Sequence, residues 1–489
     1  MLVLGVDIGT SSLKLGAVDV ESGTLADWRH GDYEPQHPQL GWSELDAECY
    51  WQAFTASLNQ LKIDRREVRA IAVSSQAQSF VPVDQEGRTL QNVWTWLDNR
   101  AALEASELNK TISHHDLFNA TGLRDISPGL LPAMLKYLKN HHPRIVQRTW
   151  KYLFSSSYLI RQLCGQAVAD ENLAAMSGMY DWHRNVWWER MLGAVGIDSD
   201  QLPNVVPSGA VVGKILPKIS HELGLSDDVL IVTGANDQTA NALGAGLLNE
   251  KGVLIVLGSA LVLYRVMDSD QVPTPSDTSG VWGPYPIRGT SYQLGYTNSG
   301  CGTVDWAKEL LTPEIPYSDL FDRMAKVSAG SEGVTWLIDL DGVASFDNKE
   351  YRGTIAGLSR KTNRWTILRA AVEAVACSVR ELTERMNWNL NGQEIRIAGG
   401  GARSDLWVQI HAEVLKTPVT CLDHEQSGVI GSCILAAVGA NFLNGFKNAM
   451  EKMVRPGRLF KPDPSVGKQY QELYERFRRL RKTGNLFYK

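Results

Sequence analysis

A chain of 489 residues is too long for one compact hydrophobic core, so its length predicts two large domains. Hydrophobic residues make up 44% and charged residues 21%, which excludes disordered, collagen-like and coiled-coil chains. The net charge of -5 argues against a general nucleic-acid-binding surface. Six scattered cysteines without a CxxC pair are typical of reduced thiols in a cytoplasmic protein. We expect neither a signal peptide nor a membrane span, because no basic segment precedes Asp7 and no apolar stretch is long enough.

Residues 2–19 predict a β-hairpin with a phosphate-sized turn. An apolar run carries Asp7 near its end, a Gly-Thr-Ser-Ser turn follows, and a second apolar run returns. Small residues let backbone N–H and hydroxyl groups approach phosphate oxygens, and Asp7 can hold a hydrated Mg²⁺. An ordinary hairpin with a polar turn explains the pattern as well, so this motif alone leaves both interpretations open.

Aromatic and charged residues follow at a junction between a strand and a helix. Trp96, Asp98 and Arg100 offer a stacking surface with hydrogen-bond acceptors and donors, as a polyhydroxyl ligand needs. The polar residues 74–79 end a preceding strand and are expected nearby. A helix N-cap with a surface arginine is the alternative. The elements predicted before this junction are a helix over 43–61 and strands over 68–73 and 80–83.

After a mostly helical section over 130–190, an apolar strand reaches Gly234-Ala235-Asn236-Asp237, and a helix is predicted from Ala240 to Ala245. A carboxylate beside a positive helix N-terminus is well oriented, and we expect Asp237 to stay ionised at neutral pH. Such a group suits a general base for a hydroxyl nucleophile in phosphoryl transfer. Simple N-capping of the helix explains the same residues.

The second half of the chain repeats the opening pattern. Residues 252–268 again predict strand, Gly-Ser turn and strand, which indicates an internal duplication and favours the phosphate interpretation of both hairpins. A helix is predicted over 368–382. A strand over 394–398 then leads through three glycines into a helix, which permits close approach of a base or a phosphate. A tight strand-to-helix turn is the simpler alternative.

Taken in order, these motifs resemble the FGGY carbohydrate kinases of the sugar kinase, Hsp70 and actin superfamily, over nearly the whole chain. The matching segments are Asp7 to Ser11 with Lys14, then residues 96–100, 132–143, 234–237, 257–260 and 399–407.

The resemblance implies an α/β fold with two ribonuclease-H-like (actin-like ATPase) domains and a cleft between them. Residues 1–243 would form the N-terminal, sugar-binding domain and residues 244–489 the C-terminal, ATP-binding domain. The implied reaction transfers the γ-phosphoryl group of ATP, with Mg²⁺, to a hydroxyl of a small sugar in the cytoplasm. The implied partners are the sugar and ATP, with a homodimer common in the family.

Residue roles follow from the resemblance by position. Asp237 is implied as the catalytic base, and Asp7 as the catalytic carboxylate that organises Mg²⁺ through water. The implied phosphate contacts are Thr10, Ser11, Lys14, Gly258 and Ser259, and the implied adenosine contacts are Gly400, Gly401, Ala402 and Ser404. The implied sugar contacts are Gln76, Gln78, Trp96, Asp98, Arg100, Asn236 and Asp237.

Two departures from the family pattern concern the sugar. Xylulokinase-like members carry Gly-Gln-Met-His-Gly where this chain has Ser75-Gln76-Ala77-Gln78-Ser79, so an amide replaces the imidazole at Gln78. Residues 336–345 lack the Glu-Arg and the Pro of a second-domain loop. The implied acceptor is a ketopentose such as xylulose or a related sugar. A gluconate or polyol kinase of the same family, and a non-catalytic sugar-binding pseudokinase, are the alternatives.

Overall fold

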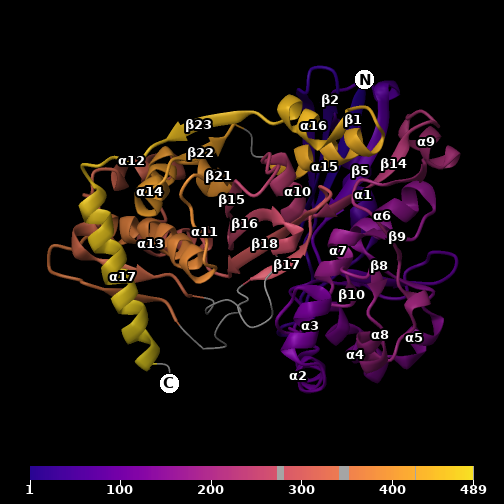
Figure 1. The fold of residues 1–489 in the computed structure, drawn as a ribbon, viewed down its shortest axis with the longest axis horizontal. Coiled ribbons are helices and arrows are strands. Elements are labelled where there is room, and N and C mark those ends of the chain that lie inside the picture. The colour runs from indigo at the N-terminus through magenta and orange to yellow at the C-terminus, as the bar shows by residue number, and fades with distance from the viewer. Residues whose placement is uncertain (272–279, 341–351, 424–425, 488–489) are drawn as a thin grey trace.

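The computed structural model describes residues 1–271, 280–340, 352–423 and 426–487. Two mixed sheets organise the molecule and occupy its right and left parts in Figure 1. The first sheet has the strand order β13-β14-β5-β1-β2-β3. Its strands are β1 (Leu2–Ile8), β2 (Ser12–Asp19), β3 (Leu25–Asp32), β5 (Val68–Ser75), β13 (Val211–Lys214) and β14 (Leu230–Asn236).

The second sheet has the strand order β17-β18-β16-β15-β21-β22-β23. Its strands are β15 (Gly252–Leu257), β16 (Leu261–Asp268), β17 (Val281–Pro284), β18 (Thr290–Thr297), β21 (Glu394–Ala398), β22 (Val419–Leu422) and β23 (Pro456–Phe460). The helices of this half are α11 (Cys301–Leu311), α12 (Tyr317–Met324), α13 (Arg364–Arg385), α14 (Asp405–Leu415), α15 (Ser427–Gly439), α16 (Gly445–Met453) and α17 (Gly467–Phe487), and a small sheet pairs β19 (Thr335–Leu337) with β20 (Thr354–Ala356).

The first half carries further helices and small sheets below its main sheet (Figure 1). The helices are α1 (Glu48–Gln60), α2 (Ala102–Thr111), α3 (His114–Thr121), α4 (Leu131–His141), α5 (Pro143–Arg148), α6 (Ser155–Cys164), α7 (Glu171–Met176), α8 (Glu189–Val195), α9 (Pro217–Leu223) and α10 (Asp237–Gly244). The short strands are β4 (Glu44–Leu45), β6 (Phe80–Val83), β7 (Val93–Trp94), β8 (Lys151–Phe154), β9 (Val168–Asp170), β10 (Tyr180–Asp181), β11 (Val186–Trp187) and β12 (Asn204–Val206).

The two main sheets share one plan. In each, a central strand pairs antiparallel with the next strand of the chain and parallel with a later one: β1 with β2 and β5, and β15 with β16 and β21. The spatial order β3-β2-β1-β5-β14 therefore matches β18-β16-β15-β21-β22. Both predicted hairpins and the duplication are confirmed, and the architecture is two ribonuclease-H-like units.

Strand β1 shows why an almost wholly apolar sequence forms this centre. All seven of its residues are buried, because helices cover both faces of the sheet. Leu4 and Val6 pack in the cluster that contains Phe54 of α1, whereas Val3 packs with Val429 of α15. The period of two along the strand separates the two faces.

Helix α15 crosses from the second half of the chain onto the first sheet, where it lies beside β1 and β2 in Figure 1. Gly5 permits this contact, because a Cβ there would stand 2.3 Å from the carbonyl oxygen of Val429. The hydroxyl of Ser432 donates to the carbonyl oxygen of Val6 at 3.0 Å. The two halves are therefore joined through the centre of the first sheet.

Two predicted helix boundaries were wrong. The first helix begins at Glu48 rather than residue 43, because Glu44 pairs with Trp94 as part of a four-stranded sheet. The helix expected from Ala240 begins at Asp237, because the Asn236 side chain caps it by accepting from the N–H of Gln238. Within the described residues, no helix is both long and apolar enough to span a bilayer.

Candidate active site

Asp7 and Asp237 come together at one edge of the first sheet. Strands β1 and β14 both run parallel to β5, which lies between them, so their carboxyl ends share an edge about 10 Å apart. Asp7 is only 7% exposed, and among the described residues its Oδ1 has no hydrogen-bonding partner. An unpartnered buried carboxylate oxygen is costly unless a ligand occupies it.

The two carboxylates influence each other's ionisation. Burial raises the pKa of Asp237 to about 7, the negative charge of Asp7 adds to the rise, and hydrogen bonds from Gln238 oppose it. Burial also raises the pKa of Asp7, against the positive charge of Lys14, which faces it across the hairpin. Desolvation therefore opposes the ionisation that we expected for Asp237 at neutral pH, and that expectation stays a prediction.

We expect the raised pKa of Asp237 to appear in the pH dependence of the reaction. A general base works only when deprotonated, so kcat/KM should fall as pH drops through about 7. The variant Asp170→Asn is a matched control: burial also raises the pKa of Asp170 to about 7, but this residue caps α7 through the N–H of Leu173. The fall in kcat/KM near pH 7 should persist in that variant. A fall near pH 4 instead in the wild type would contradict the assignment of Asp237 as the general base.

The turn of the first hairpin contacts the Trp96 segment. The indole N–H of Trp96 donates to Oγ1 of Thr10 at 3.0 Å, and the hydroxyl of Tyr33 donates to the carbonyl oxygen of Gly9 at 2.7 Å. Ser11 is exposed at the tip. The predicted phosphate contacts Thr10 and Ser11 thus adjoin the predicted sugar contact Trp96.

Gln76 and Gln78 differ in their surroundings. Gln76 is 3% exposed, and its backbone N–H donates to the carbonyl oxygen of Ile8. Its side-chain amide lies near the hydroxyl of Tyr50, but neither amide atom makes a hydrogen bond of good geometry to any described residue. Gln78 has a φ of 66°, and its amide donates to the carbonyl oxygen of Met176 at 3.1 Å. Gln76 therefore offers an unsatisfied amide beside the end of β1, whereas Gln78 is tied to α7.

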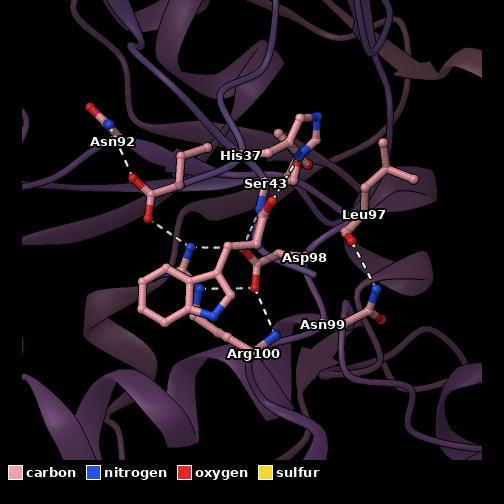
Figure 2. A network of polar contacts seen from close by, with 10 residues as sticks. His37, Ser43, Asn92, Leu97, Asp98, Asn99 and Arg100 are labelled. Carbon is pink, nitrogen blue, oxygen red and sulfur yellow. Dashed lines mark hydrogen bonds and ion pairs between the residues drawn. The ribbon is translucent and has the colours of Figure 1, made fainter. Parts of the chain in front are cut away.

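Asp98 and Arg100 form a closed buried network (Figure 2). Asp98 is fully buried and accepts from the N–H of Ser43 at 2.7 Å and from the Arg100 guanidinium at 2.8 and 2.9 Å. Arg100 also bonds Glu44 at 2.6 Å. Its guanidinium lies 3.8 Å from the ring centroid of Trp42 and 4.1 Å from that of Trp94. Direct contact of either residue with a sugar stays a prediction, and the network itself joins β4 to the loop that carries Trp96.

Removal of Arg100 should therefore cost stability. Arg100→Ala leaves the buried Asp98 and the partly buried Glu44 without their cation, and stranding a buried carboxylate typically costs about 3–5 kcal/mol in the free energy of unfolding. Arg66→Ala is the matched control, because Arg66 pairs with Asp64 at an exposed position and should change little. Urea denaturation measures both. Equal small effects would show that the buried network contributes no more than a surface pair.

The second hairpin, β15 and β16, lies against the glycine-rich turn at residues 399–401. Gly401 packs under the end of β15, since a Cβ there would stand 2.9 Å from Cβ of Leu257, whereas a Cβ on Gly400 would enter open space. The N–H groups of Gly300 and Cys301 donate to the carbonyl oxygens of Ser259 and Gly258, both at 2.9 Å. The structure thus brings the predicted phosphate and adenosine segments of the second half to one edge.

Ala402 and Ser404 continue this turn. Ala402 is buried, and the hydroxyl of Ser404 caps α14 by accepting from the N–H of Trp407 at 3.3 Å. Asn236, on the sugar side, is likewise buried and caps α10. The adenosine or sugar contacts of these three residues stay predictions.

Sequence reasoning missed two elements of this region. The segment Asn298 to Gly302 enters α11 beside the second hairpin, and its small residues before a helix are a local signal that could have been used. Gly428 of α15 lies against Asp7, and no local pattern announces this contact between opposite ends of the chain.

Two duplicated ribonuclease-H-like sheets, each with a hairpin turn of glycine and hydroxyl residues, and two carboxylates at one sheet edge define a phosphotransferase of the actin-like ATPase fold. The chain belongs to the FGGY family of carbohydrate kinases, whose N-terminal domain matches residues 2–244 and whose C-terminal domain matches residues 253–440. The resemblance inferred from the motifs is confirmed, and the protein is an ATP-dependent sugar kinase.

Individual relatives extend over the whole chain. A xylulose kinase from Staphylococcus xylosus is 26% identical over 482 residues, which cover 98% of this chain and 99% of the relative. A gluconokinase from Bacillus licheniformis is 25% identical over 492 residues, which cover 97% of this chain and 94% of the relative. The crystal structure of a xylulose kinase from Rhodospirillum rubrum matches with a TM-score of 0.89 at 25% identity and full coverage of both chains.

Proposed function

We propose that the protein transfers the γ-phosphoryl group of ATP to a hydroxyl of a neutral ketopentose such as xylulose. The observation that carries this proposal is a contrast between two side chains. The buried amide of Gln76 has no hydrogen bond of good geometry to the described residues, whereas the guanidinium of Arg100 is already bound by Asp98 and Glu44. An amide suits the hydroxyl and carbonyl groups of a ketose. A sugar acid would call for an available cation, and Arg100 is held by two carboxylates.

Asp237 and Asp7 take different roles in this reaction. Asp237, with a pKa raised to about 7, accepts the proton of the attacking hydroxyl. Asp7 presents an oxygen that has no partner among the described residues, which fits a hydrogen bond to a water ligand of Mg²⁺. The metal ion would neutralise charge on the transferring phosphoryl group when bound with ATP. Lys14 stands opposite Asp7 and adds positive charge at the same place.

The two halves of the chain are proposed to bind different substrates. We propose that residues 1–243 hold the sugar and residues 244–489 hold ATP, with closure of the intervening cleft excluding water. The exposed Ser259 and the open space at Gly400 support nucleotide contacts there. We also place the protein in the cytoplasm, which its six free cysteines support, and propose a homodimer without nucleic-acid or membrane partners.

A substrate panel tests the function. Release of ADP is measured with Mg²⁺ and ATP for ketopentoses, gluconate, xylitol and glycerol. We expect kcat/KM for xylulose or another ketopentose to exceed that for gluconate by at least about tenfold, which corresponds to about 1.4 kcal/mol of transition-state discrimination. A preference for gluconate would overturn the neutral-sugar proposal. Binding of sugars without ADP release from any of them would favour a pseudokinase.

A further inference from the structure

The first turn of α15 lies directly against the Asp7 carboxylate. A Cβ built on Gly428 would stand 2.3 Å from Oδ2 and 2.8 Å from Cγ of Asp7, both far inside van der Waals contact. Real Cβ atoms do not approach other atoms so closely, so this position tolerates only a residue without a side chain. Gly428 therefore forms one wall of the space in which the carboxylate stands.

The same turn also contacts the helix that begins with Asp237. The hydroxyl of Ser427 donates to Oδ1 of Asn241 at 2.7 Å, and the amide of Asn241 donates to the carbonyl oxygen of Asp237 at 3.0 Å. The helices cross closely here, since a Cβ on Gly244 would stand 1.8 Å from the carbonyl oxygen of Ser427. One turn of one helix thus touches both carboxylate-bearing elements.

Packing matters for Asp7 because hydrogen bonding does not fix its Oδ1. Its Oδ1 is buried without a partner among the described residues, so the shape of the surrounding wall limits the rotation of the carboxylate. A ligand that binds through this oxygen needs it within a few tenths of an ångström of its place. The wall comes from α15, which follows β22 of the second sheet.

We propose that Ser427 and Gly428 are positioning residues for phosphoryl transfer. Gly428 sets the orientation of Asp7 for the hydrated metal ion, and Ser427 holds α10, and with it Asp237, at a fixed distance from Asp7. The catalytic consequence rests on the proposed function, whereas the contact between Gly428 and Asp7 does not. Although this turn belongs by sequence to the half that is proposed to bind ATP, α15 packs on the first sheet, against β1, β5 and α10.

Metal binding is the first test, with Mn²⁺ and ADP titrated into each purified protein and followed by electron paramagnetic resonance. Gly428→Ala should weaken Mn²⁺ binding by about 10–100-fold, as is typical when a residue that orients a metal ligand is changed. The Mg²⁺ concentration for half-maximal activity should rise in parallel, while KM for the sugar stays within about twofold. Ser427→Ala should lower kcat with a smaller effect on Mn²⁺.

Two glycines provide matched controls. Gly193 lies exposed in α8 with open space around its Cα, so Gly193→Ala should bind Mn²⁺ as the wild type does. Gly431 lies on α15 against the carbonyl oxygen of Ala240 and does not contact Asp7, so Gly431→Ala should lower the thermal midpoint without weakening Mn²⁺ binding in the folded protein. Equal loss of Mn²⁺ binding in Gly428→Ala and Gly431→Ala would reduce the effect to helix packing and overturn the proposal.

A double-mutant cycle tests the contact without any reference to activity. If the methyl group of Gly428→Ala collides with the Asp7 carboxylate, the loss in thermal midpoint should shrink in an Asp7→Ala background. Additive losses would overturn the proposal, as would unchanged Mn²⁺ binding in a folded Gly428→Ala protein. Absence of kinase activity with every sugar would overturn the proposed function alone, because the cycle still measures the contact.

Discussion

Asp237→Asn should lower kcat by about 10²–10⁴-fold while the dissociation constants of sugar and nucleotide change little. Asparagine has nearly the shape of aspartate and can still accept from the N–H of Gln238, which bonds Asp237 at 2.8 Å. It cannot take the proton of the attacking hydroxyl. Turnover is measured by ADP release, and binding by calorimetry.

The ionisation of Asp237 adds a prediction on stability. Because burial and the charge of Asp7 raise its pKa, the ionised form is disfavoured in the folded state. The contribution of Asp237 to stability is therefore fully present below about pH 4 and is lost as pH rises through about 7. Asp237→Asn should remove this loss, so the variant should be at least as stable as the wild type at pH 8.

Near-normal turnover of Asp237→Asn would show that Asp237 is not the general base.

Asp7→Asn should lower kcat by about 10²–10³-fold and weaken the binding of Mg²⁺ with the nucleotide. The substitution removes the negative charge from a buried position whose Oδ1 has no partner in the described part of the chain, and an amide is a weaker ligand for a hydrated cation. The Mg²⁺ dependence of ADP release and direct Mn²⁺ titration measure the two effects.

Loss of the Asp7 charge should also change the pH dependence. The charge of Asp7 raises the pKa of Asp237. In Asp7→Asn, the residual kcat/KM should therefore begin to fall only at a pH below about 7. Asp19→Asn is the matched control, because Asp19 lies at the other end of the same hairpin, opposite Leu2. Asp19→Asn should keep both the metal dependence and the fall in kcat/KM near pH 7. An unchanged pH dependence in Asp7→Asn would show that the two carboxylates do not interact.

The sequence predicted those parts of the fold and site whose signal is local. Strand periodicity and turn residues located both hairpins, and the repeat of one pattern in each half predicted the duplicated sheets. Asp7, Asp237 and Gly400 lie at strand ends or strand-to-helix turns, where short sequence motifs can be recognised. Their order along the chain was specific enough to indicate the family, which the domain matches confirm.

Tertiary structure alone decided what the side chains of those motifs meet. The closed pairing of Arg100 with Asp98 and Glu44 depends on β4 lying beside β7, which no local pattern showed. The raised pKa of Asp237 depends on desolvation by neighbours distant in sequence. The contact of Gly428 with Asp7 spans almost the whole chain. Backbone propensity acts between near neighbours, whereas burial, charge and close packing depend on which segments the fold brings together.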